Sequence, residues 1–157
     1  MKGGNDVGWR EEDEALAARL TSMDGLDQCS FLLDESLRCG PPPDGLCEPE
    51  YRIPGCQITI WARIRPRSGG LLLECASDSL LAGAVLHRLC EWCAQLPPAQ
   101  LADWQPAFLR ALDDMVIAPE IRHNGIAKAL QMVRAAARRA DAPPKGVWTP
   151  EALLAEP

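Results

Sequence analysis

The chain has 157 residues, of which 47% are hydrophobic and 24% charged, and its formal net charge is -6. These proportions are typical of one soluble globular domain and exclude an intrinsically disordered chain. The acidic balance argues against nucleic acid as a partner, because a phosphate backbone would be repelled. The N-terminus lacks the apolar core of a secretory signal, and no stretch approaches the roughly 18 apolar residues of a membrane span. We therefore expect a cytoplasmic protein with no membrane partner and with reduced cysteines.

Two short helices are predicted at the N-terminal end. Residues 1–13 are polar and are expected to form a flexible N-terminus, whereas 14–22 is rich in good helix formers. A second helix is predicted from Asp27 to about Arg38, because apolar residues recur there near the spacing of one buried helix face. The residues expected on that face are Leu26, Cys29, Leu33 and Leu37.

A strand hairpin is predicted in the middle of the chain. Residues 39–55 hold five prolines and three glycines, which is typical of a long surface loop. Residues 57–65 then alternate between apolar and polar side chains, as a half-buried strand does. A loop at 66–70 would lead into a second, antiparallel strand at 71–75. The apolar face of the first strand is expected to carry Ile58, Ile60, Ala62 and Ile64.

The sequence after the hairpin is predicted to be mostly helical. Ser77 or Asp78 is expected to cap the first of these helices by accepting hydrogen bonds from its free N–H groups. A Pro-rich tail at 141–157 would follow the last helix, with one further turn after Thr149 and Pro150. The predicted helical segments are 79–95, 100–104, 106–114 and 124–140.

These elements define an α+β fold for a single domain at 14–140. Two or three short antiparallel strands would form a small sheet, and the helices on either side of it in sequence would cover the sheet. The sequence contains neither an internal repeat nor a low-complexity tract that would suggest a different architecture.

The seven cysteines raise the question of a metal site. Structural zinc sites usually combine two close pairs, and this chain has one C-x-x-C, at Cys90 and Cys93. That pair lies near the C-terminal end of its predicted helix, whereas a redox-active pair would need the N-terminus to lower the thiol pKa. We expect no metal, although a loop could gather three of the irregularly spaced cysteines, which are Cys29, Cys39, Cys47 and Cys56. We expect Cys29, Cys75 and Cys90 to fill small apolar positions in the core.

Cys56 is the one cysteine whose local sequence favours access by another molecule. Gly55 removes a side chain next to the thiol, and Pro54 stiffens the approach to it. A nucleophilic thiol must be reachable and able to ionise. The chain has no Ser/His/Asp order, phosphate loop or HExxH motif that would indicate another chemistry. A cysteine at the start of a strand is also common. An interaction domain in which Cys56 is inert therefore remains an alternative.

The order of motifs from Tyr51 to Ala140 resembles the SufE family, the sulfur-accepting partners of pyridoxal-phosphate cysteine desulfurases. Residues 53–61 read IPGCQITIW, close to the family pattern V-x-G-C-Q-S-x-V-W. Residues 77–79 stand where the family has a D-S-D-A-like helix start. Residues 121–126 stand where it has an S-R-x-x-G-L segment that opens the last helix. The resemblance implies a SufE/IscU-like α+β fold.

The resemblance also implies a function in sulfur transfer. Cys56 would accept persulfide sulfur from a SufS-like or CsdA-like cysteine desulfurase, stimulate that enzyme, and pass the sulfur to an iron-sulfur scaffold or another acceptor. The chain would need no cofactor of its own and would have no independent turnover. Whether the chain forms a homodimer is left open. The alternative is an IscU-like metal or iron-sulfur scaffold, which would need at least three gathered ligands.

Several residues around Cys56 are expected to support this chemistry. Gln57 would orient the loop by hydrogen bonding, and Gly55 would let the partner approach. The fixed positive charge of Arg122 would favour the thiolate or the persulfide anion, with a solvated surface arginine near a helix N-terminus as its other role. Asp78 and His123 are expected to be docking residues, with capping of a helix as the other role of Asp78.

Overall fold

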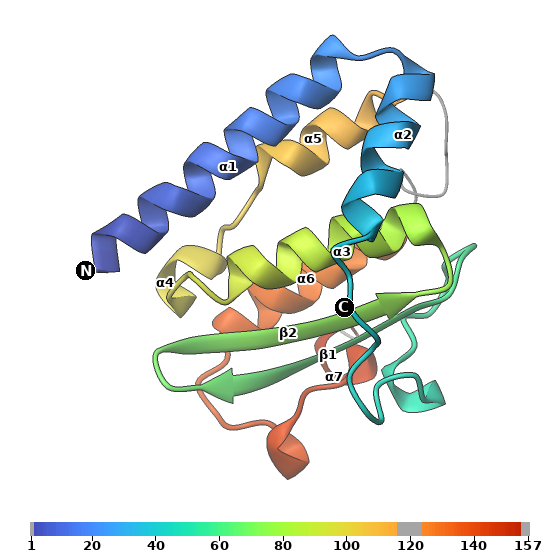
Figure 1. Cartoon of the computed structure of the whole chain (residues 1–157). Helices are drawn as coiled ribbons and strands as arrows, with labels where there is room; N and C mark the ends of the chain where they lie inside the picture. Colours follow the sequence, from blue (N-terminus) through green and yellow to red (C-terminus); the bar gives the residue numbers. More distant parts are fainter. Residues whose placement is uncertain (1, 116–123, 155–157) are drawn as a thin grey trace.

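The computed structural model of the chain describes residues 2–115 and 124–154, in which helices surround one antiparallel hairpin (Figure 1). The predicted α+β class is confirmed. No helix in these two ranges is long and apolar enough to cross a membrane. The elements are α1 (Lys2–Ser22), α2 (Gly25–Ser36), η1 (Pro49–Tyr51), β1 (Ile60–Arg67), β2 (Gly70–Ser77), α3 (Leu80–Cys93), α4 (Pro98–Leu101), α5 (Ala107–Asp113), α6 (Asn124–Ala137), η3 (Pro144–Gly146) and α7 (Pro150–Leu154).

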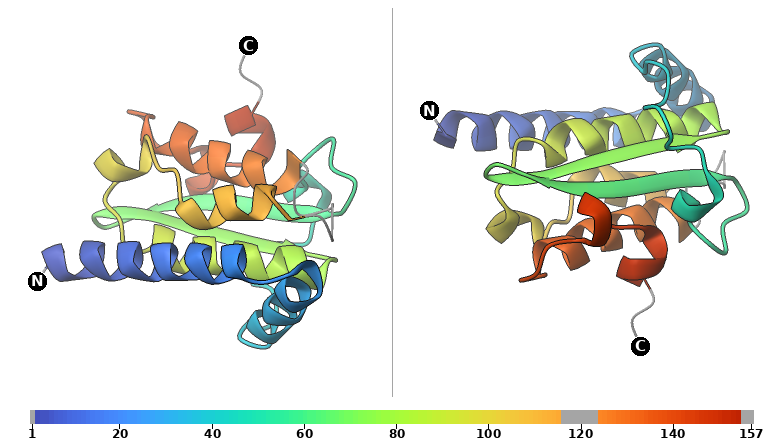
Figure 2. Two further views of the ribbon diagram at one scale, coloured as in Figure 1. Left: turned by 90° about the horizontal axis from the view of Figure 1, so that it is seen from above. Right: turned by 90° about the horizontal axis from the view of Figure 1, so that it is seen from below.

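The hairpin has one apolar face that is buried, as its alternating sequence predicts. Ile60, Ala62 and Ile64 are fully buried, and Ile64 pairs across the sheet with the buried Leu73. Directly opposite residues of an antiparallel pair share a face. The helices α3 and α6 lie side by side and pack on the hairpin (Figures 1 and 2). Strand β1 begins at Ile60 and not at residue 57, because 57–59 belong to the preceding loop.

The segment after α6 packs on the domain, although its proline content predicts a tail. Trp148 is buried, and it exchanges two backbone hydrogen bonds with Ile64 at the free edge of β1, at 2.8 and 3.2 Å. The predicted last turn is present as α7, which begins where Thr149 Oγ1 accepts a hydrogen bond from the backbone N–H of Ala152. The prolines therefore shape a segment that covers one sheet edge.

Helix α1 begins at Lys2, so the prediction of a flexible N-terminus is wrong for residues 2–13. The reason is tertiary packing that local propensity does not reveal. Trp9 is buried, and its ring centroid lies 6.1 Å from that of Trp92 and 5.9 Å from that of Trp104. Burial of one large aromatic side chain against two others stabilises helix in a stretch whose own sequence favours it little.

Asp13, one turn after Trp9, fixes α1 to the start of α5. Its carboxylate oxygens accept hydrogen bonds from the backbone N–H groups of Ala107 and Phe108, both at 2.8 Å. These N–H groups belong to the first turn of α5 and have no partner within that helix. Burial raises the pKa of Asp13, and the two backbone hydrogen bonds oppose that rise only in part.

The buried face of α2 differs from the prediction. Three of the residues expected inside are exposed, by the following fractions: Leu26 72%, Leu33 45% and Leu37 82%. The buried residues of α2 are Gln28, Phe31 and Leu32. Gln28 can be buried because its side-chain amide donates a hydrogen bond to the carbonyl of Leu20 at 2.7 Å. A prediction from the spacing of apolar residues misses this face, because the polar side chain of Gln28 lies at its centre.

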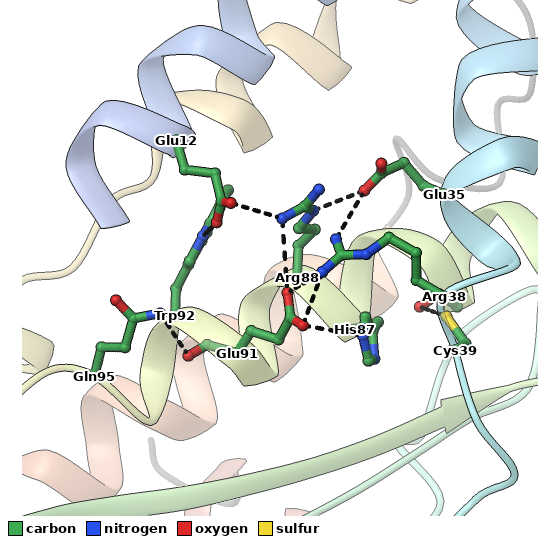
Figure 3. Close-up of polar contacts among 10 residues, drawn as sticks. Glu12, Glu35, Arg38, Cys39, His87, Arg88, Glu91, Trp92 and Gln95 are labelled. Carbon is green, nitrogen blue, oxygen red and sulfur yellow. Dashed lines mark hydrogen bonds and ion pairs between the residues drawn. The ribbon is translucent and has the colours of Figure 1, made fainter. Parts of the chain in front are cut away.

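Arg88 of α3 joins three helices through a cluster of charged side chains (Figure 3). Its Nε lies 2.7 Å from Glu35 Oε1 on α2, and its Nη1 lies 3.0 Å from Glu12 Oε2 on α1. Burial raises the pKa of Glu35, but the hydrogen bond and charge of Arg88 outweigh it and lower that pKa below its ordinary value. We call Glu12, Glu35, Arg38, Arg88 and Glu91 the helix-junction cluster.

Candidate functional site

Cys56 lies in a short loop whose two ends are tied together. The backbone N–H of Ile53 donates to the carbonyl of Ile60 at 2.8 Å and so closes the loop at its base. Gly55 has φ of 76°, in the left-handed region that favours glycine. The Pro-Gly pair noted in the sequence therefore turns the chain immediately before the thiol.

The Cys56 thiol is half-buried and packs against the hydrophobic core at the start of α6. Its Sγ lies 3.7 Å from the carbonyl oxygen of Pro54. A Cβ added to Gly125 would lie 3.2 Å from Cys56 Sγ and 2.5 Å from Ile60 Cδ1. The absence of a side chain at Gly125 therefore makes room for the thiol and for the core residue beneath it.

Lys128, one turn after Gly125, holds the same loop from α6. Its Nζ donates a hydrogen bond to the carbonyl oxygen of Pro54 at 2.6 Å. Burial raises the pKa of Cys56, while the positive charges of Lys128 and, to a lesser extent, Arg52 oppose that rise without cancelling it. At neutral pH the resting thiol is therefore protonated and sheltered.

We expect Lys128→Met to raise the pKa of Cys56 further, because the largest favourable charge is removed from a half-buried thiol. The measurement is the rate of alkylation of Cys56 against pH, followed by mass spectrometry of the tryptic peptide 53–63, in which Cys56 is the only cysteine. Lys128→Arg keeps the charge and is the matched control. A downward shift of the midpoint in Lys128→Met alone would show that the lysine acts by burying the thiol and not by its charge.

The other expected site residues fall at different places. Gly55 and the exposed Gln57 flank the thiol in the loop. Arg122 and His123 lie outside the described residues. Lys128 is the cation that sequence reasoning missed, since 74 residues separate it from its partner Pro54. No local pattern in the sequence marks it, because the contact depends on the packing of α6 over the loop.

Asp78 fastens the far end of the Cys56 loop. Its Oδ1 accepts a hydrogen bond from the backbone N–H of Thr59 at 3.1 Å, and its own N–H donates to the carbonyl of Thr59 at 3.2 Å. The cap of α3 is Ser79, whose Oγ accepts from the N–H of Ala82 at 3.2 Å, so capping by Ser77 or Asp78 was a wrong prediction. Asp78 is exposed and remains available to a partner.

The remaining cysteines are free thiols. Cys29, Cys75 and Cys90 are half-buried and pack against the core, and Cys93 is fully buried. Within residues 2–115 and 124–154, no group of three or more His, Cys, Asp or Glu side chains is arranged to hold a metal ion.

Fold and site together define a small α+β protein that holds one thiol in a hydrogen-bonded loop beside a lysine. A family model described as "SufE: Fe-S metabolism associated domain" matches residues 14–137. The chain therefore belongs to the SufE family, as its motifs suggested, and the family is associated with Fe-S metabolism.

Solved structures support the fold. The chain is similar to a hypothetical protein from Thermus thermophilus, whose solution structure superposes with a TM-score of 0.61 at 20% sequence identity. The match covers 82% of this chain and 94% of that protein. No curated protein matches the chain.

Proposed function

We propose that this protein accepts persulfide sulfur on Cys56 from a pyridoxal-phosphate cysteine desulfurase, stimulates that enzyme, and delivers the sulfur for iron-sulfur cluster assembly. The observation that carries the proposal is the placement of the Cys56 thiol in a closed loop, against Gly125 and beside Lys128. Membership of the SufE family supports a cysteine desulfurase as the partner in general terms.

The chemistry is a thiol exchange. The Cys56 thiolate attacks the outer sulfur of the desulfurase persulfide, so that a new S–S bond forms and the S–S bond on the desulfurase breaks. The desulfurase cysteine leaves as a thiolate, and Cys56 carries the sulfur as a persulfide. Oxidation states balance within the exchange, so the transfer needs neither an oxidant nor a resident cofactor.

Burial of the thiol is consistent with a loop that moves when the partner docks. A persulfide is easily oxidised, so a sheltered resting position protects it. Attack requires the thiol to reach the partner's sulfur, and Lys128 must then release or follow the carbonyl of Pro54. Once Cys56 leaves its half-buried position, the burial that raises its pKa is lost, and ionisation becomes easier.

The test is to incubate the protein with a cysteine desulfurase, pyridoxal phosphate and cysteine, and to measure sulfide release and intact mass. We expect the wild type to gain the mass of one or more sulfur atoms at Cys56 and to raise the rate of sulfide release. Cys56→Ser should do neither.

Cys47→Ser is the matched control, because Cys47 is an exposed thiol in a neighbouring loop. It should behave as the wild type does. Stimulation by Cys56→Ser equal to that of the wild type would end the proposal, as would a wild type that never gains sulfur.

A further inference from the structure

Lys128 and the Cys56 thiol share one acceptor, the carbonyl oxygen of Pro54. The ammonium Nζ donates to this oxygen at 2.6 Å, and the thiol donates to the same atom from a distance of 3.7 Å. A thiol has one weak donor, whereas a lysine ammonium has three N–H donors. Within the described residues, Pro54 is the one hydrogen-bond partner of Nζ, so Lys128 can donate to a further acceptor.

Two glycines allow the ammonium and the sulfur to come close to this loop. A Cβ on Gly55 would lie 2.9 Å from Lys128 Nζ. A Cβ on Gly125 would lie 3.2 Å from Cys56 Sγ. Gly125 and Lys128 lie on one face of α6, because residues three apart are neighbours on a helix surface. The same helix face therefore supplies the room for the sulfur and a positive charge beside it.

Loading of Cys56 with sulfur would change the charge at this place. The terminal sulfur of a persulfide lies about 2 Å beyond Sγ, the length of an S–S bond. A persulfide loses its proton more readily than the parent thiol does, and its anion has no S–H to donate to Pro54. A charge in a half-buried position is costly unless an opposite charge pairs with it. The loaded protein therefore needs a cation at Cys56.

The charged groups around Cys56 favour Lys128 for this role. Within the described residues, Lys128 and then Arg52 are the cations whose charge acts on the thiol. Lys128 is also bound to the loop itself, through Pro54. The carboxylate of Asp78 is at the far end of the loop, where it accepts a hydrogen bond from the backbone N–H of Thr59.

We propose that Lys128 binds the persulfide anion of loaded Cys56, with one N–H kept on Pro54 and another donated to the terminal sulfur. This inference rests on the proposed function, because it requires Cys56 to carry sulfur. The empty thiol rests in the sheltered position as a neutral group, and the loaded group returns there as an anion that Lys128 neutralises. Lys128 thus holds the transferred sulfur as well as the loop.

The test loads Cys56 chemically, so that it does not depend on a desulfurase. Inorganic polysulfide is added to the full chain. The Cys56 thiolate attacks one of its sulfur atoms, an S–S bond forms, an S–S bond of the polysulfide breaks, and the shortened polysulfide leaves as an anion. After the reagent is removed, iodoacetamide is added at a series of pH values without a reductant. The mass of the tryptic peptide 53–63 separates alkylated persulfide from alkylated thiol.

The midpoint of the alkylation rate against pH is compared between loaded and empty protein. We expect Lys128→Met and Lys128→Gln to raise the persulfide midpoint by about one pH unit or more. The thiol midpoint should shift less, because Lys128 meets the thiol only through Pro54. Glutamine keeps an N–H donor for Pro54, so equal effects of the two variants assign the shift to charge. Lys128→Arg keeps the charge, and Lys145→Met removes an exposed lysine of η3; both should resemble the wild type.

Equal shifts of the thiol and persulfide midpoints in Lys128→Met and Lys128→Gln would overturn the inference. A wild type whose Cys56 holds no persulfide after chemical loading would overturn it too. The proposed function is tested separately, by enzymatic transfer from the desulfurase to Cys56. Enzymatic transfer without a shift of the persulfide midpoint would remove the role of Lys128 and leave the proposed function intact. A shifted midpoint without enzymatic transfer would support Lys128 as the partner of the persulfide and end the proposed function.

Discussion

Arg88→Met should lower the free energy of unfolding by about 3–5 kcal/mol, the usual cost of leaving a buried charge without its partner. The side chain of Arg88 is only 10% exposed and that of Glu35 only 15%. Methionine fills a similar volume, but it removes the ion pair at 2.7 Å and leaves the Glu35 carboxylate only the longer ion pair with Arg38, at 3.5 Å. The measurement is urea-induced unfolding, followed by circular dichroism.

The same variant should change how stability depends on pH. In the folded wild type the pKa of Glu35 is lowered from its ordinary value of 4.5, chiefly because Arg88 outweighs the effect of burial. A lowered carboxyl pKa contributes stability above the unfolded value, and this contribution is lost as the pH falls through the folded pKa. The difference between wild type and Arg88→Met should therefore be largest above pH 4.5 and should shrink below it.

Two controls separate charge from packing at Arg88. Arg138→Met removes an ion pair with Asp103 whose side chains are 59% and 91% exposed, and should cost at most about 1 kcal/mol. The double variant Arg88→Met/Glu35→Met removes both buried charges and should recover part of the loss. If the loss of unfolding free energy in the double variant equalled the sum of the losses in the two single variants, the ion pair would contribute no coupling energy.

Gly125→Ala is expected to destabilise the protein by about 1–3 kcal/mol, as overpacking of a core does. The new methyl group would stand 2.5 Å from Ile60 Cδ1 and 3.2 Å from Cys56 Sγ. Both neighbours must shift, so the Cys56 loop should also be displaced. The alkylation rate of Cys56, measured on the peptide 53–63, should therefore rise together with the loss of stability.

Gly83→Ala is the matched control, because Gly83 lies within α3 and a Cβ there would meet nothing within 4 Å. Alanine favours helix over glycine, so this change should stabilise the protein by about 0.5–1 kcal/mol. The two substitutions are chemically identical, but their effects on the free energy of unfolding should have opposite signs. If Gly125→Ala were as stable as Gly83→Ala, then the close approach of α6 to the thiol would not matter to the fold.

The sequence predicted the elements whose signals are local. Strict alternation located the buried face of β1, since Ile60, Ala62 and Ile64 point to the same side whatever packs against them. The Pro-Gly turn located the bend before Cys56, because a positive φ favours glycine. The motif order around Cys56 indicated the family that the comparison then established.

The features that the sequence did not reveal depend on distant partners. The exposed leucines of α2 have the spacing of a buried face, and only the docking of Gln28 against Leu20 shows which face is inside. Lys128 belongs to the Cys56 site because α6 packs over the loop, a contact that no local pattern contains. The helical start of α1 depends in the same way on Trp92 and Trp104.

The capping of α5 by Asp13 has a consequence for the way the chain acquires its structure. Helix α5 has seven residues, and isolated helices below about 12 residues are marginal in water. Its first hydrogen bonds come from a residue 94 positions earlier, so α5 gains this support only after α1 has docked. During synthesis α1 leaves the ribosome before Trp92 and Trp104 do, so Trp9 makes its ring contacts with them only after they emerge. The nascent chain therefore passes through a stage with an exposed aromatic side chain, which is a stage at which chaperones act on proteins.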